Sequence, residues 1–188
     1  MGSSLVQRRG RLRPRRPKAK LVVRALRASA QRGNVQFGAF TLPCALGRSG
    51  IRVIKREGDG ATPRGRFPIR CILFRPHGLR PRAAISLRAI SNNDGWCDQP
   101  MDRNYNREVG LPYAASAERL WRDDRLYDIV VVLGHNDLPR VRNRGSAIFM
   151  HVARANFAAT EGCIALRARD LRRLISVLPR NSEIVIET

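Results

Sequence analysis

The chain has 188 residues, of which 43% are apolar, enough for one hydrophobic core and too short for two ordinary domains. No stretch approaches the roughly 20 consecutive apolar residues of a membrane-spanning helix, so no transmembrane segment is expected. Lys and Arg number 36 against 15 Asp and Glu, giving a formal net charge of +21. Such a charge attracts polyanions, with nucleic acid the first partner to consider and carboxylate-rich polymers or anionic membranes next.

The N-terminal segment is expected to be a disordered basic tail. Residues 1–20 carry eight cations, two prolines and no acid, so they bury too little apolar surface to fold. We therefore assign residues 21–188 to a single domain. The start of that domain, 21–30, weakly resembles a signal sequence, but Arg24 and Arg27 interrupt its apolar part. The sequence thus offers no clear export signal.

Short β-rich runs separated by Gly, Pro, Asn or Asp predict that sheet dominates the domain. The expected strands are 21–26, 35–42, 51–56, 67–74, 85–90, 128–134, 147–152 and 184–186. The run 128–134 is the most apolar of these and predicts a strand buried on both faces.

Two helices are expected beside the strands. The first follows Ser116 as its N-cap and includes Glu118, Leu120 and Trp121. The second presents aliphatic side chains at the i, i+3, i+4 and i+7 spacing of one helix face, namely Leu171, Leu174, Ile175 and Leu178. The predicted fold class is mainly β, a β-sandwich-like mixed sheet with one or two appended helices.

The chemistry is expected at Cys163 and His151. His151 lies within an apolar β run, and Cys163 follows twelve residues later, directly after Gly162. A glycine before a cysteine permits a sharp turn and leaves room for a substrate backbone, as a nucleophile needs. A nearby imidazole draws off the thiol proton, and backbone N–H groups around Gly162 and Cys163 are candidates to bind an oxyanion. The alternative is a buried structural cysteine and a core histidine.

These residues resemble a known signature. The chain is similar to the short proteobacterial-type branch of the YkuD-type L,D-transpeptidases, in which a strand His is followed by Ser/Thr-His-Gly-Cys. His151, Thr160, Gly162 and Cys163 match that signature, and the segment 58–68 resembles the family's Thr-Pro-x-Gly-x-Phe turn. The two motifs together are more specific than either alone.

The resemblance implies a YkuD-like fold and an acyl transfer without metal or cofactor. Cys163 would attack an L–D peptide bond in a peptidoglycan stem peptide, form a thioester and pass the acyl group to an amine of a neighbouring stem, in a 3-3 or 1-3 crosslink. His151 would act as acid and base. Transfer to water would instead make the protein an L,D-carboxypeptidase.

The chain departs from the family pattern at the substrate side. Glu161 replaces the usual His before Gly-Cys, Ala165 replaces the Arg that commonly follows, and the interval from His to Cys is shorter than usual. Arg154 is our candidate replacement for the missing Arg.

Further substrate-binding candidates come from polar and aromatic segments that suit a peptide groove. With Thr160, Glu161 and Arg154, the candidates are Trp96, Tyr105, Tyr113, His135 and Asn136. Cys44, Cys71 and Cys97 are expected to be structural.

Two rival functions stay open on the sequence alone. A nucleic-acid-binding module fits the charge, but the chain lacks a stacking platform and recognised binding motifs, so no specific nucleic acid is expected. A cysteine protease of another fold lacks a papain-like Cys-Gly-x-Cys segment. The localisation expected from the substrate is the periplasm or cell envelope, and the oligomeric state is not predicted.

Overall fold

The computed structural model describes residues 19–76 and 80–188. Of the basic tail expected over 1–20, residues 1–18 lie outside the described residues, whereas Lys20 begins a strand. The domain limits of 21–188 therefore stay a prediction.

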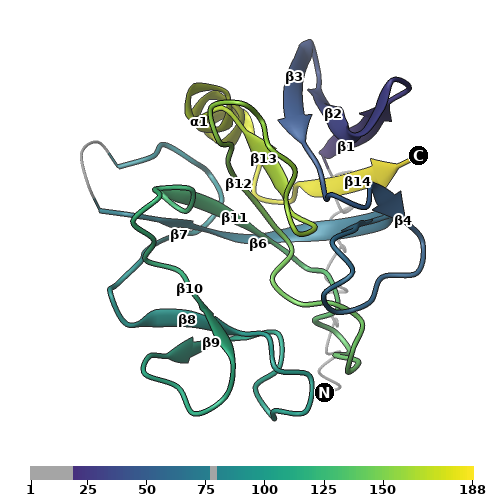
Figure 1. The fold of residues 1–188 in the computed structure, drawn as a ribbon. Coiled ribbons are helices and arrows are strands. Elements are labelled where there is room, and N and C mark those ends of the chain that lie inside the picture. Colours follow the sequence, from purple (N-terminus) through teal and green to yellow (C-terminus); the bar gives the residue numbers. More distant parts are fainter. Residues whose placement is uncertain (1–18, 77–79) are drawn as a thin grey trace, which may run out of the picture.

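Within the described residues, nine strands form the main sheet. They are β1 (Lys20–Leu26), β2 (Ser29–Phe37), β3 (Phe40–Ala45), β6 (Gly65–Phe74), β7 (Leu87–Ala89), β11 (Ile129–Leu133), β12 (Phe149–Val152), β13 (Ile164–Leu166) and β14 (Glu183–Glu187). Their order is β11-β12-β13-β3-β2-β1-β14-β6-β7 (Figure 1). β11 also pairs with β6, so the sheet curls back on itself.

The sheet is mixed. β1 runs parallel to β14, β12 to β13 and β6 to β7, whereas the other neighbours in the sheet are antiparallel. The parallel pair β12–β13 is the part that matters for the candidate site, because it places His151 opposite Ala165.

Smaller elements flank this sheet. Among the described residues, β8 (Asp94–Cys97), β9 (Arg107–Gly110) and β10 (Ala117–Arg119) form a three-stranded antiparallel sheet, drawn below the main sheet in Figure 1. β4 (Ile51–Arg52) pairs in parallel with β5 (Thr62–Pro63). Trp96 of β8 meets Phe149 of β12 edge to face, with ring centroids 5.0 Å apart, so the small sheet packs on the main one.

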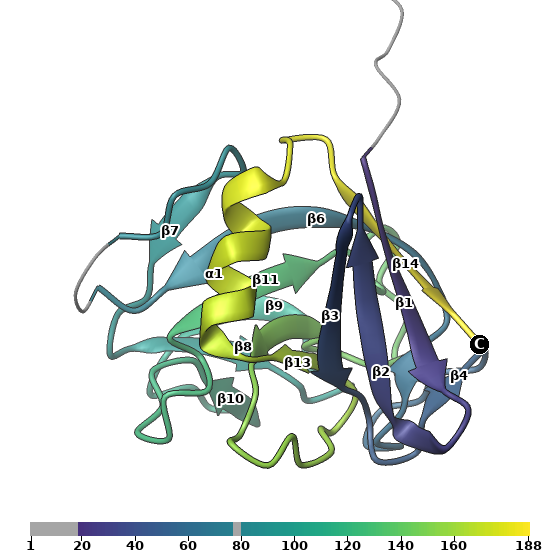
Figure 2. The same cartoon turned by 90° about the horizontal axis from the view of Figure 1, so that it is seen from above.

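The core lies on both faces of β11 and β12. Side chains alternate along a strand, so Ile129, Val131 and Leu133 join one hydrophobic cluster while Val130 and Val132 join another. The first cluster includes the aliphatic face of α1 (Ala168–Val177), which lies across the sheet in Figure 2. The second lies towards the small sheet and includes Leu73, Ile90, Leu120, Tyr127 and Phe149.

Several expectations from the sequence are confirmed. The fold is mainly β, with a mixed sheet and, in the described ranges, a single helix. The helix expected from Leu171 and its neighbours is α1, and the run 128–134 contains the fully buried strand β11. No helix in the described ranges combines the length and apolar composition needed to cross a bilayer.

The prediction of a helix after Ser116 is wrong. Ala117, Glu118 and Arg119 form β10, where they pair with Cys97, Trp96 and Gly95. Local helix signals were overridden by hydrogen bonding to a strand about twenty residues away in sequence, a common tertiary effect.

Several expected strands are shorter in the structure, and two of the predictions, 35–42 and 51–56, differ from it most. The run 35–42 is a hairpin, because Gly38, at a φ of 54°, turns the chain between β2 and β3. The run 51–56 keeps only two strand residues, and the chain then leaves the sheet with Val53 and Ile54 exposed.

Candidate active site

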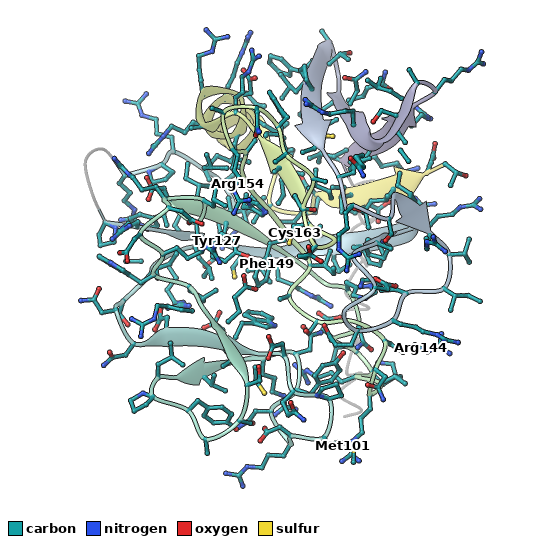
Figure 3. All side chains as sticks on the ribbon, in the orientation of Figure 1. Met101, Tyr127, Arg144, Phe149, Arg154 and Cys163 are labelled. Atoms are coloured by element: carbon teal, nitrogen blue, oxygen red, sulfur yellow. The ribbon has the colours of Figure 1, made fainter. Side chains whose placement is uncertain are left out.

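A cavity of about 570 Å³ lies where β10, β12 and β13 approach one another, and it is lined by both His151 and Cys163. Its other polar and charged wall residues are Glu57, Asp98, Glu118, Arg122, Tyr127, Ser146, Arg154, Thr160 and Glu161. Figure 3 shows Cys163, Phe149, Tyr127 and Arg154 near one another in the middle of the molecule. The structure therefore brings the two proposed catalytic side chains to one hollow.

The pairing of β12 with β13 explains this meeting. His151 is the register partner of Ala165, and Cys163 precedes Ala165 by two residues. Cys163 packs on the cluster of Phe149, on the side of the sheet opposite Met150 and Ile164. The imidazole and the thiol thus lie on the same face of the sheet, as diagonal neighbours on adjacent segments of the chain.

The imidazole is held as a neutral base. His151 is only 6% exposed, and its Nδ1 donates a hydrogen bond to the carbonyl of Val152 at 2.9 Å. That bond fixes the proton on Nδ1 and leaves Nε2 as an acceptor. The Tyr127 ring packs against the imidazole, with centroids 5.2 Å apart. Burial lowers the pKa of His151 from 6.5 to about 4, so the ring is uncharged at neutral pH.

The thiol is also neutral in this resting arrangement. Cys163 is half-buried, and its Sγ donates to the carbonyl of Ala147 at 3.2 Å and accepts from the N–H of Phe149 at 3.3 Å. Burial, with a smaller contribution from the negative charge of Glu118, raises the pKa of the thiol to about 12, although the Phe149 N–H acts to lower it. The thiol's hydrogen bonds among the described residues therefore go to backbone, not to the imidazole.

The turn before the thiol is fixed by Thr160. Its hydroxyl donates to the carbonyl of Cys163 at 2.6 Å and accepts from the N–H of Gly162 at 3.1 Å. The N–H of Gly162 is therefore already engaged within the turn, so binding an oxyanion would require that bond to open.

Gly162 is required by the chain itself. Its φ is 133°, and a Cβ at this position would lie 2.7 Å from the carbonyl oxygen of Ala61. Ala61 belongs to the segment 58–68, so the two sequence motifs that were recognised separately pack directly against each other. The room left by the glycine is filled by backbone of this chain.

One wall of the cavity is a network of charged and polar groups. Glu118 accepts a hydrogen bond from the Tyr127 hydroxyl at 2.7 Å and lies 3.4 Å from Arg122. Arg122 also pairs with Asp124 at 2.6 Å, and Arg154 approaches the same carboxylate at 4.0 Å. Burial raises the pKa of Glu118, and burial with the nearby thiol and carboxylate raises that of Tyr127 well above its usual value.

The predicted substrate residues divide into two groups. Thr160, Glu161 and Arg154 line the cavity with the thiol. Glu161 is exposed and forms an ion pair with Arg48 at 2.8 Å. Arg154 is exposed near the mouth, on the segment that follows β12.

The other five candidates lie outside this cavity, and one of them, Tyr105, contacts its wall. Tyr105 is buried and donates its hydroxyl to Glu57, which lines the cavity. The Trp96 ring packs behind Phe149. Tyr113 donates to Asp102 at 2.9 Å on the small-sheet side of the molecule.

His135 and Asn136 hold the loop that follows β11. His135 Nε2 donates to the carbonyl of Arg144 at 2.9 Å, since a carbonyl can only accept. The Asn136 amide donates to the carbonyls of Val141 and Gly145, both at 2.9 Å. Both side chains therefore stabilise the conformation of this loop by hydrogen bonds to its backbone.

Sequence reasoning missed Glu118, Arg122, Tyr127 and Ala147, which surround the thiol or its network. None of them stands in a motif near Cys163. The helix expected after Ser116 also assigned Glu118 to the wrong element. Glu118 and Arg122 stand among other charged residues in the sequence, so nothing there singles them out as site residues.

Comparison with known proteins now identifies the class. The model of the YkuD family, described as the L,D-transpeptidase catalytic domain, matches residues 25–186. The chain therefore belongs to the YkuD L,D-transpeptidase family.

Two further comparisons complete this result. The crystal structure of Mycobacterium tuberculosis L,D-transpeptidase 1 is similar at 12% identity with a TM-score of 0.38, and the match covers 89% of this chain and 61% of that one. The chain thus spans less than two thirds of the length of that structure. A search of curated proteins found no match.

Proposed function

We propose that the protein is a cysteine-dependent L,D-transpeptidase that crosslinks peptidoglycan stem peptides. The observation that carries this proposal is the shared cavity, in which the half-buried thiol of Cys163 and the neutral imidazole of His151 occupy one face. Family membership supplies the reaction class, and the cavity supplies a nucleophile and a base.

The first half of the reaction cleaves an L–D peptide bond. The thiol turns from the Ala147 carbonyl towards Nε2 of His151, which takes its proton as the sulfur attacks the carbonyl carbon of the L-residue. The C–N bond then breaks, and the imidazolium returns the proton to the departing amine of the D-residue. Because Nδ1 is tied to Val152, proton exchange is confined to Nε2.

The second half transfers the acyl group. An amine of a neighbouring stem attacks the thioester of Cys163, the imidazole accepts its proton, and the sulfur leaves as the thiol. The products are a new amide bond and the regenerated cysteine. If water takes the place of the amine, the same steps give an L,D-carboxypeptidase.

The charges of the wall suit a substrate that carries both amines and carboxylates. Glu57, Asp98 and Glu118 are acidic, while Arg122 and Arg154 are basic and lie beside Asp124. Ala165, which stands where the family commonly has Arg, lines the same cavity as Arg154. Arg154 can therefore supply to this cavity the guanidinium group that position 165 lacks. We assign carboxylate binding to Arg154, with Thr160 and Glu161 at the rim. A bacterial envelope location follows from this substrate.

The decisive experiment is incubation of the full chain with purified disaccharide-tetrapeptide, followed by mass spectrometry. The expected products are crosslinked dimers, and fragmentation of the dimers distinguishes 3-3 from 1-3 linkage. Shortened monomers alone would establish hydrolysis instead. Unchanged muropeptides would refute the proposal.

Matched variants test the roles of the two side chains. Cys163→Ala should abolish product formation, with a loss of about 10⁴-fold or more. His151→Asn should cause a large loss with unchanged binding of the donor. Cys71→Ser is the control, because Cys71 is a partly exposed cysteine outside the cavity. Equal activity of Cys163→Ala and wild type would exclude cysteine catalysis.

A further inference from the structure

Exposed aliphatic side chains gather at one end of the molecule. Of the seven large hydrophobic residues that are exposed in the described ranges, five lie on the loops 53–57, 99–107 and 138–144, and they are Val53, Ile54, Met101, Leu138 and Val141. Leu138 is 77% exposed and Val53 68%. Apolar side chains this exposed, when clustered, mark a contact surface more often than isolated ones do.

Arginines are interspersed with these aliphatic residues on the same loops. They are Arg56, Arg103, Arg107, Arg140, Arg142 and Arg144, all exposed. None of the six forms an ion pair with any of the residues 19–76 or 80–188, whereas most acidic side chains nearby are engaged. Asp59, for example, pairs with Lys55, and Asp137 with Arg70. The six guanidinium groups thus outnumber the carboxylates of the same three loops, Glu57 and Asp102, and this end carries a net positive charge.

The three loops form one continuous surface. Ile54, Arg142 and Arg144 line a common hollow of about 630 Å³, and the N–H of Glu57 donates to the carbonyl of Asn143 at 3.1 Å. Arg142 reaches the Met101 sulfur at 4.0 Å. Figure 3 shows Met101 and Arg144 at the same end of the molecule.

A second hollow extends the surface towards the small sheet. Arg103, Arg107, Arg140 and Arg142 line it together, and its volume is about 260 Å³. Burial and the positive charge of Arg107 both lower the pKa of Arg140, so the guanidinium groups are crowded enough to repel one another. We call the exposed residues of these three loops the arginine–aliphatic surface.

We propose that the arginine–aliphatic surface docks on the anionic phospholipid surface of a bilayer. Phosphate headgroups would neutralise the unpaired guanidinium groups, and the exposed aliphatic side chains would enter the acyl boundary beneath them. Charge alone would suit nucleic acid equally well. The five exposed aliphatic side chains decide between the two, because nucleic acid offers them no apolar environment and recognition of single strands uses aromatic stacking instead.

Docking in this way would set the catalytic cavity beside the membrane. Glu57 lines both the hollow of the arginine–aliphatic surface and the cavity of Cys163. The inference does not depend on the reaction that the cavity catalyses, so the two proposals are tested separately.

The test is flotation of the full chain with vesicles of phosphatidylcholine alone or mixed with phosphatidylglycerol. We expect binding to the mixed vesicles and little to the neutral ones. Two loop variants probe the two components: Leu138→Ser with Val141→Ser, and Arg142→Glu with Arg144→Glu. Each pair should weaken binding by about tenfold or more. Thermal unfolding checks that both variants are folded.

Matched controls change the same residue types elsewhere. Leu26 and Val177 are the other two exposed aliphatic residues, and Arg27 and Arg180 are exposed at other ends of the domain. Leu26→Ser with Val177→Ser, and Arg27→Glu with Arg180→Glu, should each change vesicle binding by less than about twofold.

Four outcomes would overturn the inference. They are absence of binding to phosphatidylglycerol vesicles, equal losses in the control pairs, wild-type binding by the serine pair, and displacement from vesicles by duplex DNA at equal phosphate. The last two would indicate a polyanion site in place of a membrane surface. Activity on soluble muropeptides should be unchanged in both loop variants, which separates this result from a failure of the proposed enzyme.

Discussion

The two faces of β11 and β12 differ in what they contain, although the residues alternate along the same strands. Val131 and Met150 face α1 in an aliphatic cluster, whereas Phe149 and His151 face the small sheet beside Cys163, Tyr127 and Glu118. Both faces bury apolar side chains, but the second face also holds the polar groups of the candidate site in place. Substitutions on the two faces should separate stability from activity.

The largest expected effect on stability belongs to the helix-facing side. Leu174 of α1 is 1% exposed within the first cluster. Leu174→Ala should lower the free energy of unfolding by about 3 kcal/mol, because it removes buried methyl groups and leaves a cavity. Urea unfolding measures the change. The control is Val177→Ala, on the same helix but 44% exposed, which should change stability far less. Equal losses in the two variants would contradict this assignment of the core.

The same helix shows what the sequence could reveal about the fold. The aliphatic spacing from Leu171 to Leu178 is a local property, so it predicted α1 well. The run 128–134 predicted β11 for the same reason. In contrast, Ala117–Arg119 become a strand only because β8 offers hydrogen-bond partners, and the hairpin at Gly38 depends on a turn that a continuous β-rich run conceals. Strand pairing between segments that are distant in the chain leaves no periodic pattern in the local sequence, so it could not be predicted from it.

A second effect, on the cavity side, depends on pH. The pKa of His151 falls from 6.5 to about 4 in the folded protein because the imidazole is buried. The unfolded chain binds a proton near pH 6.5 and the folded chain does not until about pH 4, so stability falls as the pH drops across this window. The loss attributable to His151 should reach roughly 2 kcal/mol by pH 5.

Urea unfolding at pH 7 and pH 5 measures that loss. His151→Asn should remove this part of the pH dependence while retaining a polar side chain beside Val152. His135→Asn is the control, since it removes a different, partly buried imidazole and should leave the contribution of His151 in place. Identical slopes for wild type and His151→Asn would show that folding does not shift the pKa of the ring.

A smaller effect is expected at the turn of the thiol. Thr160→Val removes the hydroxyl that binds both Gly162 and Cys163, and should lower the free energy of unfolding by about 1 kcal/mol. Transpeptidation should fall more steeply than stability, because the turn positions the sulfur. Thr41→Val on the exposed side of β3 is the control and should alter neither quantity. Full activity in Thr160→Val would mean that the turn is held without the hydroxyl.

The candidate site was only partly readable from the sequence. The Gly-Cys turn and the strand histidine stand in motifs, and the structure places both in one cavity. Their catalytic roles stay a prediction. Trp96, Tyr105, Tyr113, His135 and Asn136 were chosen as polar or aromatic loop residues, but in the fold their side chains contact other loops and the core. Composition indicates that a residue lies near a surface, and does not indicate towards which cavity it points.

The smallest expected effect concerns Glu118, which the sequence did not assign to the site. Its negative charge helps to raise the pKa of the Cys163 thiol, so Glu118→Gln should lower that pKa and increase the thiolate fraction at a given pH. The rate of alkylation by iodoacetamide, followed by mass spectrometry of the Cys163 peptide across pH, measures the shift.

Glu108→Gln is a matched control, because Glu108 raises the pKa of Cys71 instead. Each substitution should accelerate alkylation of its own cysteine only. A Cys163 profile unchanged by Glu118→Gln would mean that the carboxylate is already neutral, in line with the raised pKa that burial gives it.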